Sequence, residues 1–294
     1  MCKRCGIKYF EMSHLFTQWG AEHAPKIIAE VDGEEKRIFG WETDADSAEY
    51  CDFLRRFAAA LTAFIDKKGI RNFCRFHVSD EPSLEQYETY KKRADIIAEI
   101  FPGFKVIDAL SDIEFFDKGA VKYPIPSEDH VEDFVGKVDE IWTYYCCGQH
   151  NKDVPNRFFA MPSARNRILG ALLYKYNAVG FLQWGYNFWY SQFSKHEIDP
   201  FTVTDAGKAF PSGDAFVVYP GENGQPLNSL RLKVFYDGLQ DFAAMRLLES
   251  LVGREKALEI IVRDDEFSFL KYPHGSSYLI ALRERVNQAI KENI

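Results

Sequence analysis

The chain has 294 residues, of which 46% are hydrophobic and 27% charged, so it is long enough for one large or two small folded domains. The formal net charge is −8 and the sequence has no block of like charges. This argues against a nucleic-acid partner, because binding a phosphate backbone needs a basic surface. No run of about 18 apolar residues occurs, so we expect no membrane span.

The first residues and the cysteines bear on the cellular compartment and on cofactors. Residues 1–6 contain no apolar core like that of a signal peptide, and the spacing of the six cysteines suits reduced thiols better than a disulfide framework. Cys2 and Cys5 are spaced like half of a zinc site, but no second pair of Cys or His residues follows at a matching distance. These features slightly favour the cytoplasm and predict neither a metal nor another cofactor.

Strands and helices alternate in the first half of the chain. We expect strands at 7–12, 72–78 and 105–110, a hairpin that turns at 31–34, and helices at 44–68 and 84–101. Asp44 or Asp46 would cap the first helix and Gly69 would end it. Ser83 would cap the second helix.

The alternation continues in the second half, after a loop that contains Pro124 and Pro126. We expect strands at 140–146, 179–184 and 215–219, and helices at 131–135, 163–176, 229–252, 254–263 and 277–292. Such alternation predicts a parallel sheet with helical crossovers. Six principal strands are two short of a (β/α)8 TIM-like barrel, so we expect one incomplete barrel domain over 1–294 that lacks the first two βα units.

Asp80 and Glu81 follow directly after the apolar strand predicted at 72–78. Both cannot be hidden in a core, because an unpaired buried carboxylate is costly. Catalytic groups of (β/α)8 barrels gather at the ends of strands, and two carboxyls in different environments can cleave a glycosidic bond. The alternative is structural: both acids precede the helix that opens at Ser83 and would stabilise its dipole.

Aromatic residues make up 15% of the chain and gather between positions 142 and 193. Trp and Tyr have flat apolar faces with polar tips, which can stack on sugars. The alternative to sugar binding is that these aromatic residues form a core. A core explains Trp142 and Phe181, which lie in the middle of predicted strands, better than the run 184–189, which continues past the end of its strand. His77 lies near the pocket end of its strand, although a histidine on a strand is more often a hydrogen-bonded core residue. The predicted carbohydrate-binding residues are His14, Trp19, Trp41, His77, Tyr144, Trp184, Tyr186, Asn187 and Trp189.

Four separated motifs together resemble one known family. They are the segments 9–21, 77–82 and 184–189, and the pair 219–221 with 229–231. The chain resembles the catalytic domain of glycoside hydrolase family 123, also described as domain of unknown function 4091. The resemblance implies a (β/α)8 barrel preceded by a β-sandwich domain, and we expect this sequence to lack the sandwich.

The resemblance also implies an activity, that of a retaining, exo-acting β-N-acetylgalactosaminidase on glycans that end in an N-acetylhexosamine. The 2-acetamido oxygen of the sugar would attack the anomeric carbon. By motif, Asp80 would stabilise that group and Glu81 would act as acid and then as base. Two alternatives remain open: a carbohydrate-binding barrel without catalysis, and a glycosidase with a different sugar specificity.

Overall fold

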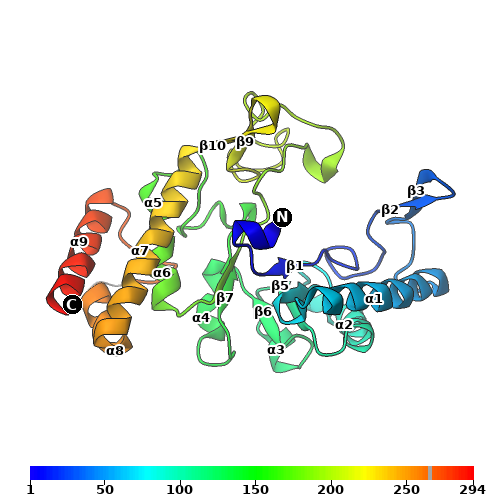
Figure 1. The fold of residues 1–294 in the computed structure, drawn as a ribbon, viewed down its shortest axis with the longest axis horizontal. Helices are drawn as coiled ribbons and strands as arrows, with labels where there is room; N and C mark the ends of the chain where they lie inside the picture. Colours follow the sequence, from blue (N-terminus) through cyan, green and yellow to red (C-terminus); the bar gives the residue numbers. More distant parts are fainter. Residues whose placement is uncertain (264–266) are drawn as a thin grey trace. The chain divides into compact units, whose positions relative to one another are not determined.

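The computed structural model describes residues 1–263 and 267–294. The chain divides into two compact units, residues 1–139 and 140–294, and both combine helices with strands (Figure 1). Over the described residues, the strands form one four-stranded sheet and three two-stranded sheets, without a closed barrel.

The sheet of the first unit has the order β1-β4-β5-β6, and all of its neighbouring strands are parallel. This confirms the parallel pairing that the alternating pattern predicts. The strands are shorter than expected: β1 is Phe10–Glu11, β4 is Cys74–Phe76, β5 is Lys105–Ala109 and β6 is Tyr123–Ile125.

Strand β6 is absent from the predicted elements, because two prolines in 124–126 indicated a loop. Pro124 pairs in register with Asp108 of β5. Proline is tolerated there because β6 lies at the edge of the sheet, where its missing N–H removes no bond to a further strand.

The predicted hairpin is confirmed as β2, Ile27–Val31, paired antiparallel with β3, Glu34–Phe39. Asp32 and Gly33 connect the two strands, and both have positive φ, at 57° and 82°. Two successive residues with positive φ are typical of the turn that matches the twist of a hairpin.

The long first helix, α1, spans Ala48–Lys68. Gly69 ends it in the left-handed conformation, as predicted, but the N-cap is Ser47 rather than Asp44 or Asp46. Asp46 instead pairs with Lys92 and Arg93 on the next long helix. The other helices of this unit are α2, Tyr87–Ile100, α3, Glu114–Asp117, and α4, Val131–Phe134.

The second unit contains two separate strand pairs. β7, Trp142–Tyr144, is parallel to β8, Gly180–Leu182, and β9, Val218–Pro220, forms an antiparallel pair with β10, Pro226–Asn228. The predicted helix at 163–176 divides at Ile168 into α5, Ala164–Arg167, and α6, Leu169–Lys175. The three final helices, α7, Leu230–Val252, α8, Arg254–Val262, and α9, Ser276–Glu292, lie beside one another (Figure 1).

Short 3-10 turns occur between these elements. They span Cys2–Cys5, Arg71–Phe73, Leu84–Gln86, Glu128–His130, Cys147–Gln149, Gln192–Ser194 and Glu222–Gly224.

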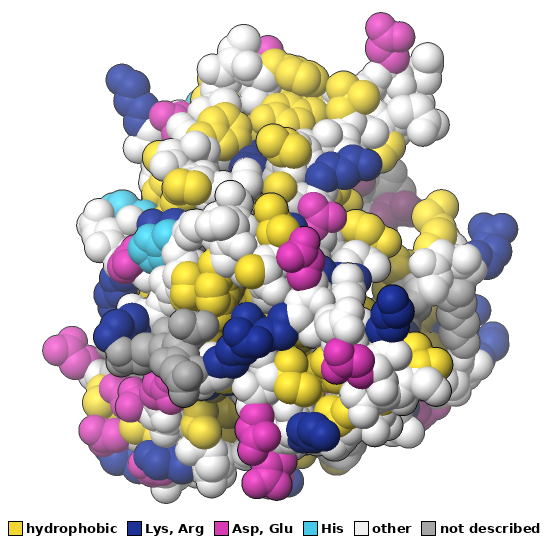
Figure 2. Space-filling model, turned by 90° about the vertical axis from the view of Figure 1, so that its left-hand side faces the viewer, with side chains coloured by type: hydrophobic (Ala, Val, Ile, Leu, Met, Phe, Trp, Pro, Cys, Tyr) yellow, Lys and Arg dark blue, Asp and Glu magenta, His cyan; other side chains and the backbone are white. Residues whose placement is uncertain are grey.

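On the face drawn in Figure 2, acidic and basic side chains are interspersed with hydrophobic ones.

Helices α6 and α7 approach closely where two glycines meet. A Cβ atom at Gly170 would lie 1.8 Å from the carbonyl oxygen of Gly238, which is backbone and cannot rotate away. We expect Gly170→Ala to lower the free energy of unfolding by about 1–3 kcal/mol, because overpacking outweighs the better helix propensity of alanine. Chemical denaturation measures this change, with Gly148→Ala as the control because its nearest atom is 3.5 Å away. Equal stability of the two variants would contradict the close approach.

Candidate active site

The acid pair lies in a backbone segment that is bonded on both sides. Trp19 donates its backbone N–H to the carbonyl oxygen of Asp80 at 3.0 Å, and Glu81 donates its N–H to the carbonyl oxygen of Ala109 at 2.8 Å. Trp19 follows β1 in the chain, and Ala109 is the last residue of β5. The segment therefore stays between its two neighbours after the ladder of β4 has ended.

The two carboxyl groups have different surroundings. Asp80 is half-buried and its Oδ2 accepts a hydrogen bond from Gln18 Nε2 at 2.9 Å, whereas Glu81 is exposed. Glu81 has a φ of 45°, in the left-handed region that residues other than glycine seldom adopt. Such strain persists only where the surrounding structure imposes it, and it is common at active sites.

The turn that opens the following helix is capped by its own residues. Ser83 donates its backbone N–H to Gln86 Oε1 at 3.0 Å, and Gln86 donates its own N–H to the carbonyl oxygen of Ser83 at 2.9 Å. These residues cap the turn that leads into α2. Capping of this turn therefore uses Ser83 and Gln86.

His77 lies on the same segment but is only 2% exposed. Its Nδ1 is 3.1 Å from Asp108 Oδ1, and its Nε2 is 2.7 Å from Glu11 Oε1, which is an ion-pair contact rather than an aligned hydrogen bond. The ring of His14 meets the His77 ring edge to face, with centroids 5.1 Å apart. His14 is half-buried.

Burial alone would lower the pKa of His77. The hydrogen bond to Asp108, the contact with Glu11 and the negative charges of both acids outweigh burial and raise this pKa to about 10. The imidazole ring of His77 is therefore charged around neutral pH.

Two of the predicted carbohydrate-binding tryptophans lie in the first unit and are about half exposed. Trp19 is 49% exposed, and Trp41, which follows β3, is 50% exposed. Trp19 also donates its backbone N–H to the carbonyl oxygen of Asp80. An exposed indole offers a flat surface on which a sugar can stack.

The aromatic run of the second unit follows β8 and is fixed by its backbone. Phe188 donates its N–H to the carbonyl oxygen of Ala215 at 3.1 Å, and Val217 donates to the carbonyl oxygen of Tyr186 at 2.9 Å. Gly185 is needed here, because a Cβ atom would lie 2.5 Å from the backbone oxygen of Asp214. Rigid backbone leaves the side chains of this run with defined directions.

Trp184 is held by its polar tip while much of its ring stays accessible. Its Nε1 donates to Asp214 Oδ2 at 3.0 Å, and the rings of Phe188 and Phe210 each lie 5.1 Å from it. Trp184 is 40% exposed and Tyr186 is 56% exposed. Both residues therefore have the accessibility that sugar stacking needs.

The other predicted residues of the second unit differ in accessibility. Tyr144 on β7 is only 5% exposed. Asn187 is exposed, and its backbone forms an isolated antiparallel β-bridge with Phe216. Trp189 is half-buried, and its Nε1 donates to the carbonyl oxygen of Val218 at 3.0 Å. The acid pair belongs to the first unit and this group to the second.

Sequence reasoning missed two fully buried acids, Asp108 and Asp214. A single acid in the apolar stretch 106–110 was a signal for Asp108, but its partners are distant in the sequence. Burial raises the pKa of Asp214 to about 6, although the hydrogen bond from Trp184 and the positive charge of Arg157 act in the opposite direction.

Within residues 1–263 and 267–294, no three His, Cys, Asp or Glu side chains are arranged so that they could hold a metal ion. No helix in that part of the chain has the length and apolar character needed to cross a membrane.

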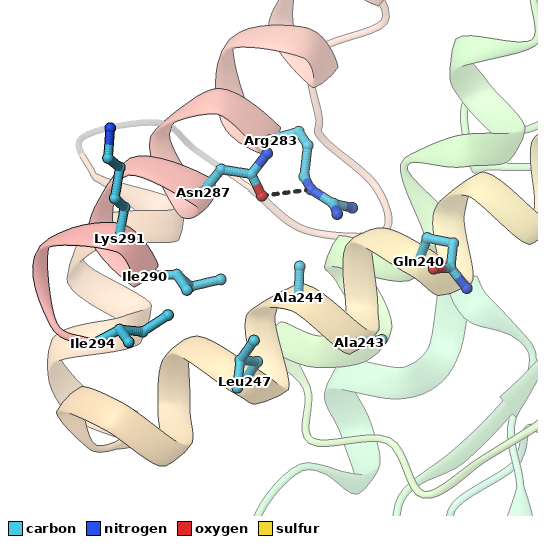
Figure 3. A pocket seen from close by; sticks show the side chains of 9 residues that line it. All are labelled: Gln240, Ala243, Ala244, Leu247, Arg283, Asn287, Ile290, Lys291 and Ile294. Carbon is cyan, nitrogen blue, oxygen red and sulfur yellow. Dashed lines mark hydrogen bonds between the residues drawn. The ribbon is translucent and has the colours of Figure 1, made fainter.

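An open groove of about 630 Å³ lies between α7 and α9 (Figure 3). Leu247 of α7 and Ile290 of α9 line it from opposite sides, and Arg283 donates to Asn287 at 2.9 Å at one end. Its lining contains no Asp or Glu side chain, so the groove lacks the acid pair that hydrolysis of a glycoside needs. The lining residues are Gln240, Ala243, Ala244, Leu247, Arg283, Asn287, Ile290, Lys291 and Ile294.

A mixed α/β unit with two adjacent carboxyls at the end of a parallel strand has the groups of a glycoside hydrolase. Comparison with known families agrees: the sequence profile of the glycoside hydrolase 123 catalytic domain matches residues 1–248. The chain belongs to glycoside hydrolase family 123. No curated protein sequence matches it significantly.

Among solved structures, the chain is similar to a family 123 glycoside hydrolase from Clostridium perfringens, which was described in work on the hydrolysis of glycolipid glycans. The TM-score is 0.60 and the sequence identity is 18%. The similarity covers 91% of this chain and 49% of the other, so the chain spans about half the length of that enzyme. At this identity the likeness concerns the fold.

Proposed function

We propose that the protein is a retaining, exo-acting β-N-acetylgalactosaminidase that uses the 2-acetamido group of its substrate. The observation that carries this proposal is the acid pair, with a half-buried Asp80 beside an exposed Glu81 in a segment bonded on both sides. A carboxylate and a carboxylic acid side by side suit this reaction, because no protein nucleophile is required across the sugar ring.

In the proposed first step, the acetamido oxygen attacks the anomeric carbon while the glycosidic C–O bond breaks. Glu81 gives its proton to the departing oxygen, and Asp80 stabilises the positive charge that develops on the acetamido nitrogen. In the second step, Glu81 takes a proton from water as the water oxygen attacks the anomeric carbon and the oxazolinium ring reopens. Two inversions at one carbon give net retention.

We also propose that the predicted incomplete (β/α)8 TIM-like barrel is the architecture of this domain. Four parallel strands in one sheet and the parallel pair β7–β8 support it. The substrate class would be glycans that end in an N-acetylhexosamine, including the glycan part of glycolipids, since the similar clostridial enzyme was described for glycolipid glycan hydrolysis.

Trp184 is proposed to bind carbohydrate through its exposed ring. We expect Trp184→Ala to weaken binding of a glycan ending in N-acetylgalactosamine on the order of tenfold, because an aromatic contact contributes about 0.5–1.5 kcal/mol beyond its buried area. Isothermal titration calorimetry measures this affinity. Phe193→Ala is the matched control, since Phe193 is a 60% exposed aromatic residue of the same region. Equal affinities of both variants and the wild type would remove Trp184 from the binding surface.

The proposed activity can be tested with an aryl β-N-acetylgalactosaminide and the wild-type chain. We expect release of the aryl alcohol, a first product with the β configuration by proton NMR, and inhibition by a thiazoline that mimics the oxazoline. Binding of the sugar without any product would indicate a carbohydrate-binding protein instead. Turnover that the thiazoline does not inhibit would indicate a glycosidase with another mechanism or sugar specificity.

A further inference from the structure

The β4–β5 ladder ends before the acid pair is reached. Its paired residues are Arg75 with Lys105 and Phe76 with Val106. Two residues beyond β4, the backbone N–H of Val78 donates to the side chain of Asp108 on β5 rather than to the backbone of that strand. Both carboxylate oxygens of Asp108 lie 3.1 Å from this nitrogen.

The carboxylate of Asp108 is completely buried and has three sources of hydrogen bonds. Besides Val78, it contacts His77 Nδ1 at 3.1 Å and accepts from the hydroxyl of Tyr90 on α2 at 2.5 Å. Burying a carboxylate is costly, and it is retained only where its oxygens are well satisfied. Asp108 therefore joins β4, β5 and α2 at one point.

The groups facing His77 complete this arrangement. Asp108 lies on one side of the ring, Glu11 at the end of β1 on the other, and His14 against the ring edge. A charged ring between two acids links three neighbouring strands of the sheet, β1, β4 and β5. The residue that follows Asp108, Ala109, accepts the backbone N–H of Glu81 at 2.8 Å.

We propose that Asp108, together with His77, is the positioning residue of the acid pair: it fixes the backbone from Val78 to Glu81 so that the carboxyl of Glu81 is aimed at the departing oxygen. This proposal rests on the proposed function and assigns His77 to positioning rather than to contact with the sugar. It adds Asp108, Tyr90 and Glu11 to the residues on which the reaction depends.

The first test measures hydrolysis by Asp108→Asn of two N-acetylgalactosaminides, one with an acidic and one with a poorly acidic leaving group. Displacement of an acid by about 1 Å can cost on the order of 10²-fold in rate. We expect such a loss of kcat/KM on the poor leaving group and a much smaller loss on the acidic one, because in the first step only the former depends on proton donation. Asp95→Asn is the control, since Asp95 is an exposed acid on α2 paired with Lys91.

Equal fractional losses on both substrates, or unchanged activity, would overturn the proposal, because a general loss of folded protein lowers both rates alike. If Asp108→Asn does not fold, Tyr90→Phe removes one hydrogen bond to the same carboxylate and is expected to show the same leaving-group dependence with a smaller amplitude. A wild type without activity on either substrate would refute the proposed function rather than the positioning network.

A second readout does not depend on activity. NMR of the His77 ring should show a charged imidazole that does not titrate between pH 6 and pH 8, because its pKa is about 10 in the folded protein. In Asp108→Asn, or in Tyr90→Phe to a lesser degree, the midpoint should move downward. A wild-type His77 that titrates near the ordinary value of about 6.5 would contradict the network.

Discussion

Replacement of Glu81 by Gln is expected to reduce kcat by about 10²- to 10⁴-fold, the usual contribution of a general acid or base. Gln keeps the size of the side chain but has no acidic proton to give to the departing oxygen. The loss in kcat/KM, which reflects the first step, should be largest with a poorly acidic leaving group and smallest with an acidic one, which leaves without protonation. Steady-state kinetics on a series of aryl β-N-acetylgalactosaminides measures this dependence.

The matched control is Glu85→Gln, an acid-to-amide change at an exposed residue of the turn that follows the pair. Its kinetics should equal those of the wild type. Full activity of Glu81→Gln in a folded chain would show that another group supplies the proton, and the assignment of Glu81 would then be wrong.

The second large effect is expected from Asp80→Asn. This change removes the negative charge that would stabilise the acetamido nitrogen as it becomes positive. Loss of one such electrostatic contact costs about 10²- to 10³-fold in rate. The variant should also bind the thiazoline more weakly than the wild type does, because that mimic resembles the intermediate. Kinetics and inhibition constants measured together separate this effect from a loss of proton donation.

For Asp80, the hydrogen bond from Gln18 offers a graded comparison. Gln18→Ala removes the donor 2.9 Å from Asp80 Oδ2 but leaves the carboxylate in place. We expect a loss of activity that is much smaller than that of Asp80→Asn. A larger loss for Gln18→Ala would mean that the amide of Gln18, rather than the charge of Asp80, carries the effect.

The location of the acid pair could be predicted from the sequence because it depends on local features. An apolar strand followed by two acids and a capping serine defines the end of β4, and Ser83 and Gln86 do start the following helix. The parallel pairing of β1, β4 and β5 likewise follows from helices that separate the strands.

Features that depend on partners distant in the sequence could not be predicted. Asp108 is buried because Tyr90, His77 and the backbone of Val78 converge on it, and the sequence alone does not show that convergence. The edge strand β6 contains Pro124, which is compatible with a strand only because no further strand follows it in the sheet.

In the second unit, too, local features could be predicted from the sequence and contacts between distant residues could not. The aromatic run after β8 was predicted to lie beyond the strand, and Trp184 and Tyr186 are indeed accessible. Its anchoring to Asp214 and to residues 215–217 could not be read from the sequence, because it requires two loops to be paired.

The most direct measurement of the central claim compares aryl β-glycosides whose 2-acetamido group carries zero, one, two or three fluorine atoms. Fluorine withdraws electrons from the acetamido oxygen and makes it a poorer nucleophile. If this oxygen attacks the anomeric carbon with Asp80 beside it, kcat/KM of the wild type should fall steeply with each fluorine added. Rates that do not depend on fluorination would contradict the account.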